Sequence, residues 1–178
     1  MKSTQPRRIA IMGAESTGKT SLATALASLL PNAGCTPETL RAWVDANQRT
    51  PQQHEQRAIM NAQIEAENTL CAQGFSVVLC DTTPLTIALA SVHYFNDDSL
   101  LADAIAYHRL YTHTLVCAPD IPWVADGMQR DGPRVRAAIA LKIEEALARC
   151  GIAAIRVHGL GDARTAHAFA ALQWLLES

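Results

Sequence analysis

A short glycine-containing segment near the N-terminus has the residue types and the spacing that bind phosphate. Gly13, Gly18, Lys19 and Thr20 satisfy the pattern G-x-x-x-x-G-K-[ST]. In such a segment the glycines let the backbone curl so that its N–H groups face phosphate oxygens, and the following helix adds its positive end. We therefore expect Lys19 to reach the β- and γ-phosphates of a nucleoside triphosphate, and the Thr20 hydroxyl to bind Mg²⁺. The residues expected to contact the nucleotide are Gly13, Ala14, Glu15, Ser16, Thr17, Gly18, Lys19, Thr20 and Ser21.

Two carboxylates follow apolar runs and are candidates for the acceptor side of a phosphoryl transfer. Asp81 comes directly after Phe75–Cys80, where a charge is costly unless it meets a cation or hydrogen-bond donors. We expect it to bind Mg²⁺ through water, to contact the acceptor hydroxyl, or both; the alternative is a helix N-cap. Glu38 could hold ribose hydroxyls or take the acceptor's proton, or it could simply favour a helix dipole. Arg41, one turn further on, is a candidate contact on the same side.

A third unusual stretch, 123–136, carries three arginines together with two glycines and a proline. This composition is typical of a lid that closes over ATP and neutralises charge on the transferring phosphoryl group. We expect Arg130 and Arg134 to reach the phosphates. The alternative is that the arginines are solvated and pair with Asp126 and Asp131. Trp123 is a candidate for stacking on the substrate ring, although core packing fits it equally well.

The elements that must position these residues alternate between short apolar runs and helical patterns. This alternation predicts an α/β fold with a parallel sheet covered on both faces, and such folds bind ligands beyond the carboxyl ends of their strands. We predict a single domain over residues 1–178, with 1–7 disordered. The predicted strands are 8–12, 33–36, 75–80, 114–117 and 152–157; the predicted helices are about 19–30, 37–46, 51–73, 84–92, 99–111, 134–150 and 162–176.

Composition and charge exclude several classes of partner. A formal net charge of −2 without a Lys/Arg run argues against nucleic acid. No apolar run is long enough for a signal peptide or a membrane span. The five cysteines are widely spaced without a C-x-x-C pair, which is typical of reduced thiols in a cytoplasmic protein, and the six histidines form no metal pattern. The expected partners are a nucleoside triphosphate and a small-molecule acceptor; the sequence carries no signal for an oligomeric state.

The residues after the third predicted strand distinguish between classes of nucleotide-binding protein. The segment Asp81-Thr82-Thr83-Pro84 lacks the glycine of a D-x-x-G motif, and the chain has no N-K-x-D guanine motif. ATP-driven machines often place a glutamate directly after the strand-end aspartate to orient water, but Thr82 occupies that position here. Both features favour transfer of the phosphoryl group to a bound acceptor rather than to water.

Together these motifs resemble the ribosylnicotinamide kinase domain of NadR-type proteins. The resemblance lies in Ile9–Thr20, Pro37–Arg41, Val78–Thr82 with Thr86, and Pro119–Gly127 with the arginines that follow. It implies a P-loop NTPase three-layer sandwich with a five-stranded parallel sheet, as in nucleoside and nucleotide kinases. It also implies ATP- and Mg²⁺-dependent phosphorylation of nicotinamide riboside to nicotinamide mononucleotide. No H-x-G-H adenylyltransferase motif is present, so the resemblance implies the kinase step alone.

The sequence departs from the family pattern at two places, both on the acceptor side. Thr83 stands where the family commonly has the second aspartate of Asp-Thr-Asp, and Thr39-Leu40 stands where Tyr-Ala would be expected before Arg41. Two alternatives therefore stay open beside the riboside kinase. The chain could phosphorylate another small hydroxylated acceptor, or it could be a non-enzymatic switch that responds to ATP or GTP.

Overall fold

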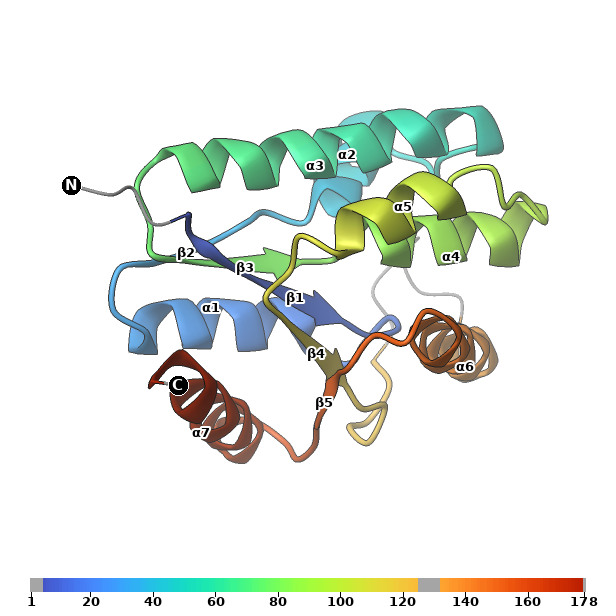
Figure 1. Cartoon of the computed structure of the whole chain (residues 1–178). Coiled ribbons are helices and arrows are strands. Elements are labelled where there is room, and N and C mark those ends of the chain that lie inside the picture. Colours follow the sequence, from blue (N-terminus) through green and yellow to red (C-terminus); the bar gives the residue numbers. More distant parts are fainter. Residues whose placement is uncertain (1–4, 125–131, 178) are drawn as a thin grey trace.

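A sheet of parallel strands forms the centre of the molecule. The structure, a computed structural model, describes residues 5–124 and 132–177. Within them, five strands pair in the order β2-β3-β1-β4-β5, and every pairing is parallel (Figure 1). The strands are β1 (Arg7–Met12), β2 (Ala33–Cys35), β3 (Val77–Asp81), β4 (His113–Cys117) and β5 (Ile155–Val157).

Helices cover both faces of this sheet. They are α1 (Lys19–Leu29), α2 (Thr39–Asn47), α3 (Gln56–Ala72) with a preceding turn η1 (Gln53–Glu55), α4 (Pro84–Phe95), α5 (Leu101–His108), α6 (Pro133–Arg149) and α7 (Asp162–Glu177). In Figure 1, α3, α4 and α5 lie on one side of the sheet, and α1 and α7 lie on the other. None of the helices in the described part of the chain is both long and apolar enough to cross a membrane. The predicted three-layer α/β sandwich is confirmed.

The central strand β1 supplies both hydrophobic cores, because successive side chains of a strand point to opposite faces. Ala10 and Met12 join the core formed with α3, α4, α5 and α6. Ile9 and Ile11 join the core formed with α1 and α7. All four of these side chains are completely buried. A strand buried on both faces explains why the run reads as continuously apolar in the sequence.

The element boundaries differ from the predictions mainly where a helix ends. The fifth strand begins at Ile155 instead of residue 152, because the backbone of Ile152 still bonds back to the last turn of α6. Its N–H donates to the carbonyl of Leu147 at 2.9 Å, after Gly151 turns the chain at φ +63°. β1 begins at Arg7, one residue earlier than predicted, so the predicted disorder of residues 1–7 is wrong at Arg7, whose N–H donates to the Ser76 carbonyl at 2.9 Å. Residues 1–4 lie outside the described residues, and their predicted disorder stays a prediction.

One buried histidine makes the stability of this fold sensitive to pH. His108, at the end of α5, is 3% exposed, and its Nε2 lies 2.9 Å from Thr114 Oγ1 in β4. Burial lowers the pKa of His108 to about 4. The folded protein therefore holds this ring neutral at pH values where the unfolded chain would bind a proton.

We predict that lowering the pH from 7 to 5 removes on the order of 2 kcal/mol of stability through His108 alone. Between the ordinary histidine pKa and the lowered one, the unfolded state binds more protons, so stability falls as the pH falls. His108→Gln keeps a partner for Thr114 but does not titrate, and its unfolding free energy should decline less over this range. Urea unfolding at several pH values measures the difference, with the exposed His54→Gln as control. Equal pH slopes for wild type and His108→Gln would refute the assignment.

Candidate functional site

The loop between β1 and α1 has the tight backbone that its glycines predict. Gly13 has φ +153°, and a Cβ there would lie 2.6 Å from Thr17 Oγ1 and 3.1 Å from the Cys117 carbonyl oxygen. Gly18 has φ +75° and forms the N-cap of α1 in the left-handed region. A side chain at Gly13 would therefore push the loop away from β4, and one at Gly18 would strain the start of the helix.

Lys19 folds back across this loop. Its Nζ donates to the Ala14 carbonyl at 2.8 Å, a bond that a phosphate oxygen can replace. The loop opens onto a pocket of about 420 Å³, which is a usual size for a small-molecule site. Residues 15–21 line it together with Glu38 and Arg41. The structure thus brings seven of the nine predicted nucleotide contacts, all except Gly13 and Ala14, and two predicted acceptor-side residues to the same pocket.

Asp81 ends β3 directly beside the loop and is 1% exposed. Its Oδ2 accepts a 2.6 Å hydrogen bond from Thr20 Oγ1, whereas its Oδ1 is buried without a hydrogen-bond partner among residues 5–124 and 132–177. Burial raises the pKa of the Asp81 carboxyl, against the lowering effects of the Thr20 hydrogen bond and the Lys19 charge. A buried carboxylate oxygen without a donor needs a cation or an incoming hydroxyl.

This pair of residues fits the Mg²⁺ ion that the sequence implies. Mg²⁺ usually takes one or two protein oxygens and completes its shell with phosphates and water. The Thr20 hydroxyl and the unpartnered Asp81 Oδ1 can supply such oxygens next to the phosphate loop. Within the described residues, no group of three or more His, Cys, Asp or Glu side chains could hold a metal by itself. A cation here would depend on the nucleotide as well as on the protein.

The residues after Asp81 resolve its predicted alternative role. Thr83, not Asp81, is the N-cap of α4, and its Oγ1 accepts from the Thr86 N–H at 3.3 Å. The N-cap alternative for Asp81 is therefore wrong. Aspartate and threonine are both good N-caps. Thr83 therefore still caps α4, although the family commonly has an aspartate at this position.

Glu38 and Arg41, at the start of α2, line the pocket together with the phosphate loop. Glu38 is the N-cap residue of α2, but its side chain makes no capping bond. Instead its Oε2 lies 3.5 Å from Arg41 Nε. Both residues also affect the pKa of Asp81, although less than burial, the Thr20 hydrogen bond and the Lys19 charge do. The Glu38 charge raises this pKa and the Arg41 charge lowers it. The charges of these two residues thus form part of the electrostatic surroundings of Asp81.

The two arms of the predicted lid attach to the phosphate loop. Trp123 Nε1 and the Gly132 N–H both donate to Glu15 Oε1, each at 3.1 Å, and the Val124 N–H donates to Ser16 Oγ at 3.1 Å. Trp123 therefore lies at the rim of the nucleotide loop, with its indole N–H already engaged.

The three lid arginines lie in different settings. Arg130, like the rest of 125–131, is outside the described residues. Arg134 is exposed in the first turn of α6. Arg136 is only 5% exposed, and its Nη2 donates to the Ile121 carbonyl at 2.8 Å, so it holds the loop after β4 rather than facing a phosphate. Arg134 is thus the predicted lid arginine that the structure leaves accessible.

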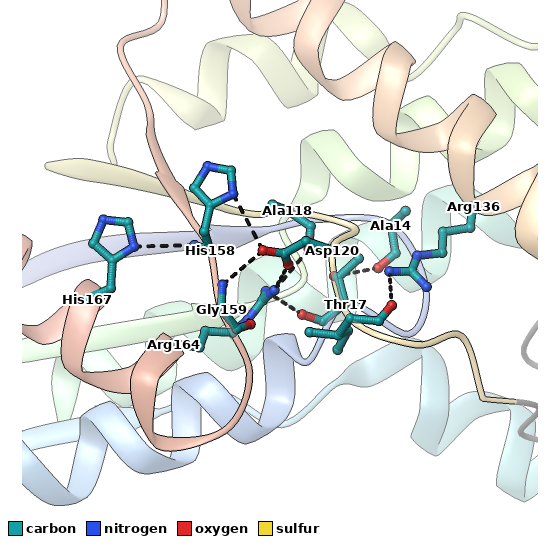
Figure 2. A network of polar contacts seen from close by, with 10 residues as sticks. Ala14, Thr17, Ala118, Asp120, Arg136, His158, Gly159, Arg164 and His167 are labelled. Carbon is teal, nitrogen blue, oxygen red and sulfur yellow. Dashed lines mark hydrogen bonds and ion pairs between the residues drawn. The ribbon is translucent and has the colours of Figure 1, made fainter.

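A second anchor of the phosphate loop was not predicted from the sequence. Figure 2 shows Arg164 of α7 reaching between three loops. Its guanidinium pairs with Asp120. It also donates to the carbonyls of Thr17 (2.9 Å), Ala118 (3.1 Å) and Gly159 (2.7 Å). The loops after β1, β4 and β5 are therefore tied to one side chain that is 4% exposed.

We predict that Arg164→Leu lowers the unfolding free energy by about 2–4 kcal/mol, because three carbonyls lose a charged donor. For a chain of this size the melting temperature should fall by roughly 5–15 °C. The control is Arg156→Leu, which removes an ion pair with Glu144 whose side chains are 47% and 41% exposed, and which should cost less than about 1 kcal/mol. Differential scanning calorimetry compares the two. A fall no larger for Arg164→Leu than for Arg156→Leu would contradict the anchoring role.

Comparisons with known proteins agree with this geometry. Residues 8–164 match the family model described as an AAA domain. The NadR protein in complex with NR has a TM-score of 0.81 at 21% identity, over 97% of this chain and 51% of its own. The NadR protein in complex with NAD and AMP-PNP has a TM-score of 0.79 at 18% identity, over 98% and 50%. The chain therefore spans about half the length of these NadR chains.

Thymidylate kinases share the same fold. The enzyme from Ehrlichia chaffeensis has a TM-score of 0.65 at 14% identity, over 97% of this chain and 100% of its own. The enzyme from Candida albicans has a TM-score of 0.66 at 14% identity, over 97% and 92%. No curated protein matches the sequence. The predicted resemblance to NadR-type proteins is confirmed, and at these identities it establishes the fold.

Proposed function

We propose that this chain, which belongs to the AAA domain family, is a kinase that transfers the γ-phosphoryl group of ATP to nicotinamide riboside. The observation that carries the proposal is the buried Asp81, bonded to Thr20 of the phosphate loop and retaining one unpartnered oxygen. A switch needs to sense a phosphate, but transfer to an acceptor also needs a group that orients a hydroxyl. The full-length likeness to a NadR protein in complex with NR supports this acceptor.

Each side chain has a role in the proposed reaction. Lys19 exchanges its bond to the loop for the β- and γ-phosphates, where its charge stabilises the transferring group. Thr20 and Asp81 would hold Mg²⁺, which supplies charge neutralisation on the phosphates, and Asp81 or Glu38 would align the acceptor hydroxyl. Glu38, which also lines the pocket, would hold ribose hydroxyls. Arg134 and Arg130 would come from the lid. Most of the acceleration comes from positioning rather than from acid–base chemistry.

The charge of the proposed acceptor suits the pocket. Nicotinamide riboside carries a positive pyridinium ring, which carboxylates and aromatic faces attract. Glu38 and Asp81 offer the carboxylates, and Trp123 at the rim offers an aromatic ring. We place the reaction in the cytoplasm, a proposal that the five free cysteines support.

We predict that Lys19→Ala lowers the riboside-dependent rate of ADP release at least about 100-fold, because a charge-stabilising contact to the phosphoryl group is lost. A coupled assay with Mg²⁺–ATP, with and without nicotinamide riboside, measures this rate. Lys142→Ala in α6 is the matched control and should keep the wild-type rate. If wild type binds ATP but releases no ADP with any acceptor, the protein is a switch and the kinase proposal fails.

A second candidate is a kinase for another hydroxylated acceptor. Thr39 and Thr83 depart from the family pattern on the acceptor side, and the fold is shared with thymidylate kinases. The same assay, run with a panel of nucleosides and nucleoside monophosphates, separates the two. Turnover confined to nicotinamide riboside supports the first proposal. A higher kcat/KM for a different acceptor would replace it.

We predict that Asp81→Asn reduces kcat at least about 100-fold and leaves ATP binding within a few-fold of wild type, because the amide keeps the shape but loses the charge. The dependence on Mg²⁺ concentration tells which role Asp81 plays. A raised Mg²⁺ requirement assigns it to the metal, whereas an unchanged requirement assigns it to the acceptor hydroxyl. A variant with wild-type kcat would remove Asp81 from the catalytic residues.

A further inference from the structure

Gln63 of α3 uses both ends of its carboxamide in hydrogen bonds to two other elements. The side chain is completely buried. Its Oε1 accepts from Thr39 Oγ1 at 2.7 Å. Its Nε2 lies 3.3 Å from the Asp81 carbonyl oxygen, 3.4 Å from Thr36 Oγ1 and 3.3 Å from Glu67 Oε1. Because a backbone carbonyl can only accept, the amine end must face Asp81 and the carbonyl end must face Thr39.

At its amine end, Gln63 helps hold the backbone of Asp81. β2 ends at Cys35, so the sheet offers Asp81 no further residue of β2 as a partner. Thr36 Oγ1 accepts from the Asp81 N–H at 3.0 Å, and Gln63 donates to the Asp81 carbonyl. The next residue, Thr82, has φ +61°, which is costly for a β-branched side chain and persists only where the surroundings fix it. Gln63 and Thr36 therefore fix the strained turn that carries Asp81.

At its carbonyl end, Gln63 holds the start of α2. Thr39 is the first residue of this helix, directly after Glu38 and two residues before Arg41. This is also a position where the family resemblance predicts a different residue, so the bond depends on a feature of this chain. One buried carboxamide thus connects the element bearing Glu38 to the turn bearing Asp81.

The carboxamide of Gln63 is also held by Glu67, which lies one helical turn further along α3. Glu67 is completely buried and accepts hydrogen bonds from Tyr111 (2.9 and 3.0 Å) and Tyr107 (3.1 Å). A leucine or methionine at position 63 would leave Thr39 and Asp81 without these bonds. A glutamate would put a second acidic group beside Glu67. The site therefore calls for a group that donates and accepts at once.

We propose that Gln63 is a positioning residue that sets the placement of Glu38 relative to Asp81 and so aligns the acceptor hydroxyl for transfer. This inference rests on the proposed phosphotransferase function. Among the described residues, the hydrogen bonds of Gln63 go to Thr36, Thr39, Glu67 and Asp81 and not to the phosphate loop or to the residues that line the pocket. We therefore expect it to act on the acceptor side more than on nucleotide binding.

Steady-state kinetics with nicotinamide riboside test the inference, because the acceptor KM and kcat should change while the Kd for ATP should not. For Gln63→Met we expect the acceptor KM to rise about 10-fold and kcat to fall about 10-fold, with the Kd for ATP within about 2-fold of wild type. Thr39→Val removes only the hydrogen bond between α2 and Gln63, leaves the bond from Gln63 to Asp81, and should raise the acceptor KM. The double variant should be no worse than Gln63→Met, because both changes break one connection. Gln56→Met, a buried glutamine two turns earlier on α3, is the control. A parallel loss of ATP affinity would overturn the proposal.

Hydrogen exchange of the α2 backbone gives a readout that does not depend on which acceptor is used. Amides of residues 39–47 should exchange at least about 5-fold faster in Gln63→Met than in wild type or Gln56→Met. Thr39→Val should show the same increase, which keeps the test valid if Gln63→Met does not fold. If wild type turns over no riboside but α2 loosens, the proposed function fails and the positioning role stands. Unchanged exchange in both variants would overturn the positioning role.

Discussion

The arrangement of the site depends on a carboxylate that is buried at the end of a strand. Asp81 is almost completely removed from water, so each of its polar atoms must be matched within the fold. Thr20 donates a hydrogen bond to one carboxylate oxygen, Thr36 accepts one from the backbone N–H, and Gln63 donates one to the backbone carbonyl. Those contacts come from α1, the end of β2 and α3. Among the polar atoms of Asp81, the second carboxylate oxygen has no partner in the described part of the chain, so it can bind a ligand.

The phosphate loop is fixed between two such anchors. On one side, Thr20 at its helical end bonds to Asp81. On the other, Arg164 bonds the Thr17 carbonyl and connects it to the loops after β4 and β5 (Figure 2). Trp123 and Gly132 add the two arms of the lid through Glu15. A loop held in this way can present its N–H groups to phosphate without first having to be ordered, which lowers the cost of binding.

The sequence was sufficient for features that depend on local pattern. Continuous apolar runs placed the strands, and the spacing of Gly13, Gly18 and Lys19 placed the phosphate loop. Arg164 and Gln63 could not be found in this way, since Arg164 meets Thr17 across 147 residues of sequence and Gln63 meets Asp81 across 18. Nor does spacing tell an arginine that holds a loop, such as Arg136, from one that faces a phosphate.

The central claim is that the γ-phosphoryl group goes to a bound riboside and not to water. Phosphorus NMR of a reaction containing the protein, Mg²⁺–ATP and nicotinamide riboside follows that group directly. We expect the γ resonance to be replaced by a single phosphomonoester resonance, which splits by coupling to the 5′ protons of the ribose. Conversion of the γ resonance to inorganic phosphate alone would mean that the protein is an ATPase and that no riboside is phosphorylated.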